Sequence, residues 1–266
     1  MNFQNNFQKN FTAKKSLGQN FLHAPNIISA MVHAGKISPE NIVLEVGPGK
    51  GALTSKLLET GVHVVAVEKD DRAVPFLQEK FAVEIKNGQL EIIHADVLEI
   101  SLEDFKNYIV IANIPYYITG EFMRKFLETK NQPTRIVVMV QKEVAKRIVD
   151  EKQSILSLSV KAYGEPKYLT SVSRKLFRPM PNVDSAVIVI ENISKKFFEE
   201  SKIDEKTYFE IIKAGFAHKR KVLVNNLEQK IPKEKLLKLF TDNDIPQTVR
   251  AEDLSPEMWK RIVGNS

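Results

Sequence analysis

The chain has 266 residues, of which 43% are hydrophobic, a size and composition that suit one large domain or a medium domain with a small one. It contains no cysteine, which excludes disulfides, zinc–thiolate sites and thiol nucleophiles, and its 5 scattered histidines lack the spacing of metal ligands, so no metal site is expected. The formal charge of +6 and the sequence pI of about 9.2 favour a polyanionic partner without naming it.

Membrane segments and export signals are not expected. No apolar run approaches the roughly 20 residues of a membrane span, and the N-terminal stretch MNFQNNFQKNFTAKK lacks the apolar core of a secretory signal. We therefore expect a cytoplasmic protein without membrane contact. Positive charge gathers at Lys9, Lys14 and Lys15, in a region without acids, and in HKRK at 218–221. These lysines and arginines are either contacts to a polyanion or ordinary solvated charge.

Apolar runs rich in β-branched residues alternate with segments of helical spacing between residues 42 and 150. The runs are IVLEV (42–46), HVVAVE (63–68), LEIIHA (90–95), YIVIAN (108–113) and RIVVMVQ (135–141). The helical segments are 51–60, 71–81, 120–129 and 143–150. Continuous apolar runs are typical of strands buried on both faces of a parallel sheet, and the alternation predicts a doubly wound α/β domain.

A glycine-rich loop follows the first of these runs. EVGPGKGALT (45–54) has glycines at three alternate positions, Gly47, Gly49 and Gly51. Glycine lets the backbone turn sharply and approach a ligand where a Cβ would clash, and the N–H groups of the helix that follows can face the same ligand. Alone this pattern is a weak signal, because glycine turns after strands are common.

Carboxylates stand at the ends of the next two strands. Glu68 ends the second, where it can accept both hydroxyls of an adenosine ribose, and Asp96 follows the third, where it can accept from an adenine amino group. Each acid alone could be a surface or helix-capping residue, but the strand ends of an open sheet are where such ligands bind. The missing Lys–Ser/Thr pair excludes a P-loop, whereas NAD and S-adenosylmethionine both fit this edge.

The fourth strand ends in NIPY (113–116), an order that favours S-adenosylmethionine because it suits methyl transfer to a planar nitrogen. The lone pair of an adenine or carboxamide nitrogen is delocalised, so it attacks poorly until the nitrogen leaves the conjugated plane. The Asn113 side-chain oxygen and the Ile114 carbonyl, kept extended by Pro115, can each accept one N–H and aim the lone pair at the methyl group. Tyr116 offers a face on which a base can stack.

The residues after this motif are interpreted as structural. Tyr117 is expected to pack behind the site, and Thr119 is expected to be the N-cap of the next helix. Two more strand-like runs, 167–174 and 185–192, are joined by the proline-rich stretch FRPMPNVD (177–184) and predict an antiparallel hairpin with an ordered loop.

From about Ser194 the pattern changes to charged helices without strand-like runs. The amphipathic stretches are TYFEIIKAGFAHKRKVLVNNL (207–227) and KEKLLKLF (233–240). We therefore predict two domains, an α/β domain at 1–193 with an N-terminal arm and a small all-helical domain at 194–266.

With these motifs in view, the chain resembles the ribosomal RNA adenine dimethyltransferases, and within them it is most similar to the bacterial small-subunit enzymes. The similar stretches are KKSLGQNFL (14–22), EVGPGKGALT (45–54), NIPYYIT (113–119), VQKEVAKRI (140–148), FRPMPNVDSAV (177–187), FAHKRKVLVNNL (216–227) and RAEDLSPEMW (250–259). They run nearly from end to end, and several are long and independent, so the resemblance is specific. EKQSI at 151–155 departs from the family pattern, which puts that local loop in doubt.

The resemblance implies a Rossmann-like, S-adenosylmethionine-dependent methyltransferase domain with a small helical C-terminal domain that binds rRNA. It implies dimethylation of N6 of two adjacent adenosines near the 3′ end of small-subunit (16S) rRNA, by a monomer that acts on the immature small ribosomal subunit during its biogenesis. The implied cofactor contacts are Asn20, Leu22, Gly47, Gly49, Glu68, Asp96 and Asn113. The implied catalytic motif is Asn113, Ile114, Pro115 and Tyr116. By the same resemblance, Phe177 closes the target pocket opposite Tyr116 and sandwiches an adenine extruded from its helix.

Other functions remain open from the sequence. N-x-P-Y also serves enzymes that methylate DNA adenines or glutamine amides, although FRPMPNVDSAV and the basic helices favour rRNA. The macrolide-resistance methyltransferases modify an adenosine of large-subunit rRNA, and RAEDLSPEMW and the spelling VDSAV argue against that assignment. A ribosome-assembly factor whose binding matters more than its methylation is a third alternative.

Overall fold

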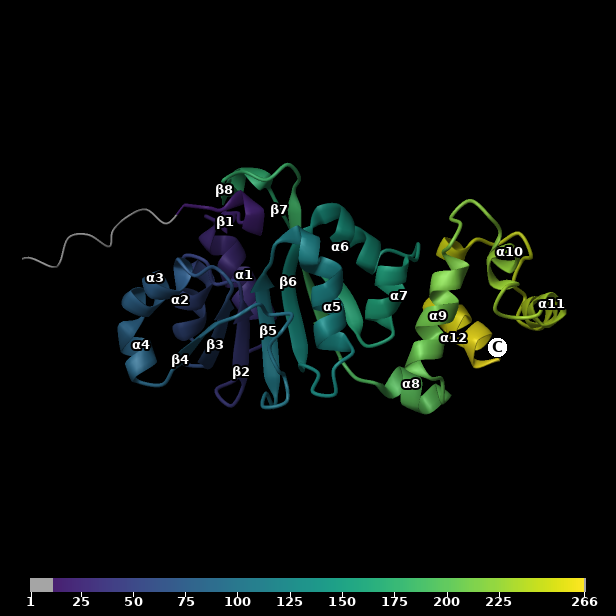
Figure 1. Ribbon diagram of the computed structural model, residues 1–266, viewed down its shortest axis with the longest axis horizontal. Coiled ribbons are helices and arrows are strands. Elements are labelled where there is room, and N and C mark those ends of the chain that lie inside the picture. The colour runs from purple at the N-terminus through teal and green to yellow at the C-terminus, as the bar shows by residue number, and fades with distance from the viewer. Residues whose placement is uncertain (1–11, 266) are drawn as a thin grey trace, which may run out of the picture. The chain divides into compact units, whose positions relative to one another are not determined.

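The computed structural model describes residues 12–265 of the chain (Figure 1). The described chain forms two compact units, each built from two stretches. One contains the chain up to Lys142 together with Leu169–Ile188, and the other contains Glu143–Tyr168 together with the chain from Val189 onward. Because neither unit is continuous in sequence, the boundary after residue 193 stays a prediction. Of the predicted basic residues, Lys9 lies outside the described part.

A seven-stranded sheet carries the strand order β4-β3-β2-β5-β6-β9-β7. Its strands are β2 (Ile42–Val46), β3 (His63–Glu68), β4 (Leu90–His94), β5 (Tyr108–Asn113), β6 (Arg135–Gln141), β7 (Glu165–Val172) and β9 (Ser185–Glu191). β4, β3, β2, β5 and β6 pair in parallel, and β5 is buried along almost its whole length. The five predicted apolar strands and the neighbouring pair β9 and β7 are therefore confirmed.

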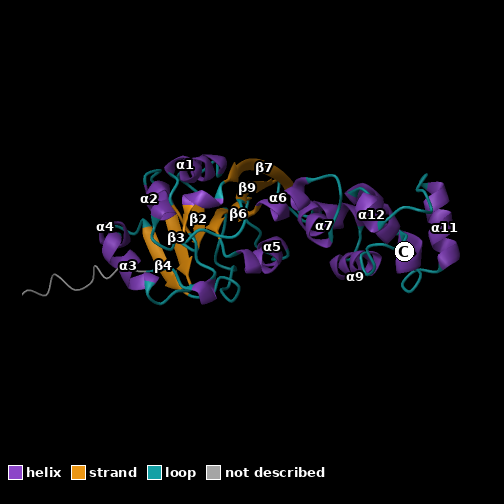
Figure 2. Ribbon diagram, turned by 90° about the horizontal axis from the view of Figure 1, so that it is seen from above, coloured by secondary structure: helices purple, strands orange, loops and turns teal. Residues whose placement is uncertain are grey.

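The sheet changes its direction of winding between β2 and β5. These strands are neighbours, with Ile42 beside Tyr108 and Val46 beside Ala112, although β3 and β4 lie between them in sequence. The loops that leave β2 and β5 therefore diverge at the carboxyl edge of the sheet, which is where ligands bind in folds of this class. Helices flank the strands (Figure 2).

The helices of the α/β region are α1 (Pro25–Ala34), α2 (Ala52–Leu58), α3 (Ala73–Lys80), α4 (Ala82–Lys86), α5 (Thr119–Leu127), α6 (Lys142–Val149) and α7 (Ile155–Lys161). From Ser194 the described residues form helices without strands, as predicted: α8 (Lys196–Ser201), α9 (Glu205–Gly215), α10 (Leu223–Leu227), α11 (Lys233–Asp242) and α12 (Pro256–Gly264). Within residues 12–265, no helix has the length and apolar character needed to cross a membrane.

Two short strands join distant parts of the chain. β1 (Phe21–Leu22) pairs antiparallel with β8 (Phe177–Arg178), so that Leu22 lies beside Phe177. Two-residue strands leave no periodic pattern, and the sequence did not predict this pairing. It brings the segment before the first helix against the proline-rich loop.

The apolar pattern at 207–227 does not form one helix, which corrects the sequence-based expectation. α9 ends at Gly215, and the side-chain amide of Asn226 on α10 donates to the Gly215 carbonyl at 2.6 Å and to the His218 carbonyl at 3.2 Å. These two bonds use carbonyls that a continuing helix would have consumed. HKRK (218–221) therefore lies in an exposed turn between the two helices.

Gly215→Ala tests the packing of the C-terminal helices. A Cβ at this position would lie 2.3 Å from the ring of Trp259, which is fully buried. Since the buried Trp259 ring and the helix backbone at residue 215 cannot move apart freely, we expect the free energy of unfolding in urea to fall by about 1–3 kcal/mol. Gly120→Ala is the control, because its Cβ would meet no heavy atom within 4 Å and alanine favours a helix. Equal effects of the two substitutions would contradict this packing.

Candidate active site

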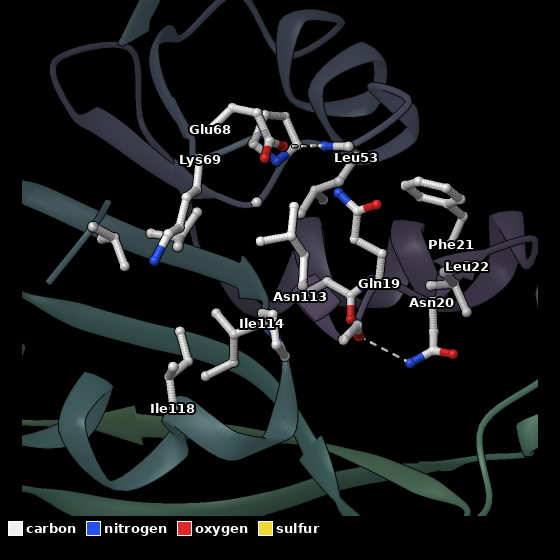
Figure 3. Close-up of a pocket in the computed structure, with 18 of the residues that line it drawn as sticks. Gln19, Asn20, Phe21, Leu22, Leu53, Glu68, Lys69, Asn113, Ile114 and Ile118 are labelled. Atoms are coloured by element: carbon white, nitrogen blue, oxygen red, sulfur yellow. Dashed lines mark hydrogen bonds between the residues drawn. The ribbon is translucent and has the colours of Figure 1, made fainter. Parts of the chain in front are cut away.

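A cavity of about 360 Å³ opens at the carboxyl edge of the sheet, where β2 and β5 diverge. Figure 3 shows Glu68 on one side of it, the segment 19–22 on the other and Asn113 between them. The site residues predicted from sequence all line this cavity: Asn20, Leu22, Gly47, Gly49, Glu68, Asp96, Asn113, Ile114, Pro115, Tyr116 and Phe177. The structure thus brings them together, while the role of each remains a prediction.

The glycine loop after β2 requires its glycines. Gly47, Gly49 and Gly51 have φ values of 72°, 56° and 71°, in the left-handed region that other residues avoid. A Cβ on Gly49 would come within 3.0 Å of the Phe21 ring, and one on Gly47 would lie 3.3 Å from the backbone oxygen of Asn113. The loop can therefore pass close to the cavity only with glycine at these positions.

Glu68 holds the loop in place. Its carboxylate, labelled in Figure 3, is 5% exposed. It accepts the Gly49 N–H at 3.0 Å and the Asp70 N–H at 2.8 Å. Burial raises the pKa of Glu68, while these two N–H groups oppose the shift. Each carboxylate oxygen has two lone pairs, so one acceptor position on each remains for a ligand.

Asp96 follows β4 at the same edge and is paired with a lysine. The Lys69 ammonium lies 2.5 Å from one oxygen of Asp96, and the other oxygen accepts the Leu98 N–H at 3.0 Å. Partial burial works against ionisation, but these contacts lower the pKa of Asp96 below its usual value. Lys69 lines the cavity and was not predicted, although it directly follows Glu68 in sequence.

Hydrogen bonds to Asp70 connect the N-terminal segment to the end of β3. The Gln19 amide donates to Asp70 at 2.7 Å, and the Arg72 guanidinium donates to both Asp70 oxygens at 2.9 and 2.7 Å. The Arg72 contact, together with the Gln19 bond, lowers the pKa of Asp70 to about 2. Sequence reasoning missed both Gln19 and Asp70, because a hydrogen bond between residues this far apart leaves no local pattern.

The NIPY motif lies at the end of β5. Ile114 is 3% exposed, and the Tyr116 hydroxyl lies 2.5 Å from the Ser185 hydroxyl. Burial raises the pKa of Tyr116, so this phenol stays neutral at physiological pH. Within residues 12–265 the Asn113 side chain makes no hydrogen bond, which leaves its amide free for a ligand. Phe177, which the sequence assigned to the same pocket, is 1% exposed.

Two expectations at this motif were wrong. Tyr117 does not pack behind the site, because its side chain is 65% exposed and lines the cavity mouth. A 3₁₀ turn over 116–118 rotates it away from Tyr116. Thr119 is not the N-cap, since Ile118 holds that position; the Thr119 hydroxyl donates to the Tyr116 carbonyl at 2.9 Å.

Glu45 on β2, two residues before Gly47, is fully buried. Among the described residues, neither of its carboxylate oxygens has a hydrogen-bond partner. Burial raises the pKa of Glu45 to about 8, and Thr54 is close enough to oppose this shift only in part. The carboxyl is therefore mostly neutral at pH 7. The sequence did not single out Glu45, because one acidic residue within an apolar strand does not reveal whether its own side chain is buried.

Comparison with known proteins identifies relatives over nearly the whole chain. The family described as ribosomal RNA adenine dimethylase matches residues 10–265. A protein of Dehalococcoides mccartyi (strain CBDB1), named ribosomal RNA small subunit methyltransferase A, is 40% identical over 258 residues, which cover 94% of this chain and 87% of the relative.

Solved structures share the fold. A dimethyladenosine transferase from Plasmodium falciparum is 25% identical with a TM-score of 0.76 and covers 91% of this chain and 95% of its own. The 23S rRNA methyltransferase ErmE has the same TM-score of 0.76 at 23% identity, covering 92% of this chain and 99% of its own, a likeness of fold alone. The α/β architecture is thus that of Rossmann-like rRNA methyltransferases.

Glu45→Gln tests the buried carboxyl. Between its ordinary pKa of 4.5 and about 8, the unfolded chain has lost the Glu45 proton while the folded chain keeps it. Rising pH therefore favours unfolding in this window, on the order of 1.4 kcal/mol for each pH unit, and has no further effect above it. Glu45→Gln should remove this fall from urea unfolding curves recorded between pH 5 and 8.5. Parallel profiles for the two proteins would contradict the assignment.

Proposed function

The chain belongs to the ribosomal RNA adenine dimethylase family, and on that premise we propose that it transfers methyl groups from S-adenosylmethionine to N6 of two adjacent adenosines near the 3′ end of small-subunit (16S) rRNA. It is an rRNA adenine dimethyltransferase. The observation that carries the proposal is that one cavity holds both the NIPY motif and the carboxylates at the carboxyl ends of β3 and β4, Glu68 and Asp96. The name of the relative from Dehalococcoides mccartyi supports the choice of the small subunit.

The cavity fits the cofactor. S-adenosylmethionine supplies a methyl group on a positively charged sulfur. The glycine loop leaves room for close backbone approach, since a Cβ on Gly49 would reach the Phe21 ring. The free acceptor positions on Glu68 suit the ribose hydroxyls, and Asp96 suits the adenine amino group. Asn20 and Leu22 cover the cofactor from the N-terminal segment.

The NIPY motif prepares the target nitrogen. The Asn113 oxygen and the Ile114 carbonyl accept the two N–H bonds of the adenine amine, which draws the nitrogen out of conjugation and directs its lone pair. Pro115, with φ −59° and ψ 135°, sustains the extended backbone after Ile114. No strong base is required, because the nitrogen becomes acidic when it gains the methyl group and then loses its proton to a carbonyl or to water.

Aromatic rings hold the base. Tyr116 stacks on the adenine, and its hydroxyl contact with Ser185 fixes the ring. Phe177 closes the pocket from the opposite side, and β1 reaches it directly through the pairing of Leu22 with Phe177. The base is extruded from its helix before reaction, as enzymes that modify a base inside a helix require.

The exposed basic turn at 218–221 is assigned to rRNA phosphates, since lysine and arginine supply the sequence-independent part of RNA binding. The partner is the immature small ribosomal subunit, and the protein acts on it as a monomer in the cytoplasm. The large-subunit alternative is less favoured, because the likeness to ErmE extends to fold alone. An assembly role that depends on binding is compatible with the same site.

Site-resolved primer extension on both rRNAs tests the reaction. We expect strong stops at two adjacent adenosines of small-subunit rRNA in cells that carry the gene and none in cells that lack it. Asn113→Ala removes one of the two acceptors of the amine and should lower the methylation rate by at least 100-fold.

Asn113→Asp is a second variant for the same test. It retains an acceptor oxygen at the same distance from the backbone but adds a negative charge beside the amine. Methylation confined to the large subunit would overturn the proposed substrate. Full activity of Asn113→Ala would remove this residue from the mechanism, and full rescue of subunit assembly by an inactive Asn113→Ala protein would favour the binding role.

Glu68→Ala tests the cofactor end. Loss of the ribose contacts and of the bond to Gly49 should weaken cofactor binding by roughly 1–3 kcal/mol, as measured by calorimetry with S-adenosylmethionine. Glu121→Ala is the matched control, because this carboxylate lines the same cavity but is exposed and has no assigned contact. Unchanged affinity in Glu68→Ala would refute the assignment.

A further inference from the structure

Tyr117 is a large aromatic side chain at the mouth of the cavity that the mechanism above does not use. It lines the cavity and is 65% exposed, whereas Tyr116 beside it is half-buried. Among the described large apolar or aromatic residues, only Val83 is exposed to a comparable degree, at 67%, and it lies on α4. An exposed ring at a nucleic-acid site is a surface on which a base can stack.

The local backbone directs the two tyrosines to different places. Residues 116–118 form a 3₁₀ turn, in which successive side chains are about 120° apart. The Tyr116 hydroxyl is directed inward to Ser185 at 2.5 Å, so the Tyr117 ring is directed outward. Two rings that diverge from adjacent residues can contact two different bases but not both faces of one.

The ring of Tyr117 is also supported from one side. A Cβ on Gly18 would lie 3.3 Å from Tyr117 Cε1, 3.5 Å from its Cδ1 and 3.3 Å from Pro115 Cβ. Gly18 itself has φ +61°, a conformation that suits glycine. One edge of the ring thus rests on backbone, while most of its surface faces solvent, so a base meets a ring that is already positioned.

We propose that Tyr117 stacks on the nucleotide next to the adenine held at Asn113, and so fixes the second adenosine of the adjacent pair while the first reacts. The inference rests on the proposed function. Extrusion of one base leaves its neighbour without a stacking partner, and an aromatic side chain can take that partner's place. Tyr117 is then a specificity residue for adjacent adenosines.

The test is a double-mutant cycle that combines a substitution in the protein with a change in the RNA. Unmethylated small ribosomal subunits are reconstituted with 16S rRNA in which one of the two target adenosines is replaced by an abasic residue, and methylation is followed at the other. The wild-type protein should lose about 5- to 150-fold in kcat/KM on the abasic RNA, mainly through KM. Tyr117→Ala should lose a similar factor on intact RNA and nothing further on abasic RNA. Tyr117→Phe should retain wild-type behaviour on both.

Three measurements separate stacking from a merely structural role. Affinity for S-adenosylmethionine should be unchanged in Tyr117→Ala. If the substitution instead disturbed Gly18 and the N-terminal segment, that affinity would fall. The urea unfolding midpoint should also be unchanged, and Val83→Ala, an equally exposed side chain elsewhere, should match the wild-type protein on both RNAs. The proposal would be overturned if the wild-type protein had the same kcat/KM on intact and abasic RNA. It would also be overturned if the losses from Tyr117→Ala and from the abasic residue multiplied as independent effects. Intact subunits left unmethylated by the wild-type protein would instead contradict the proposed function, and the stacking role with it.

Discussion

The carboxylate of Glu68 accepts the backbone N–H of Gly49 at 3.0 Å and that of Asp70 at 2.8 Å, and the geometry of the site depends on this pair of bonds. They join the glycine loop after β2 to the end of β3, beside the point between β2 and β5 where the winding of the sheet reverses. Because the carboxylate is buried, each bond is strong and costly to leave unmade. The loop, the acids and the cavity floor are therefore fixed before any ligand binds.

From Asp70 the connections continue to the target end. Asp70 accepts from Gln19, Gln19 precedes β1 in the N-terminal segment, and Leu22 of β1 lies beside Phe177 of β8. The N-terminal segment at 19–22 is thus bonded at one end to Asp70, just after β3, and paired at the other with the loop that contains Phe177. One continuous set of contacts therefore joins the carboxyl end of β3 to Phe177 through the N-terminal segment.

The sequence predicted the features that depend on local pattern. β2, β3, β5 and β6 follow from apolar runs because both faces of a parallel strand are buried, and the glycine positions follow from the turn they must make. The break between α9 and α10 was missed, because apolar spacing continues on both sides of a turn that is held by the Asn226 side-chain bonds to the Gly215 and His218 carbonyls. The β1–β8 pairing required the three-dimensional structure, because its two strands lie far apart in sequence. The exposure of Tyr117 was missed because the 3₁₀ turn over 116–118, which directs its ring outward, is not visible in the sequence pattern.

We propose that one cavity holds the methyl donor against Glu68 and Asp96 and presents the target amine to it at Asn113. A crystal structure of the protein with S-adenosylhomocysteine and the 3′ segment of 16S rRNA tests it most directly. We expect the ribose hydroxyls at Glu68, the sulfur facing Asn113, and the N6 amine of an extruded adenine between the Asn113 oxygen and the Ile114 carbonyl. A ribose away from Glu68, or an adenine whose amine faces away from Asn113, would contradict it.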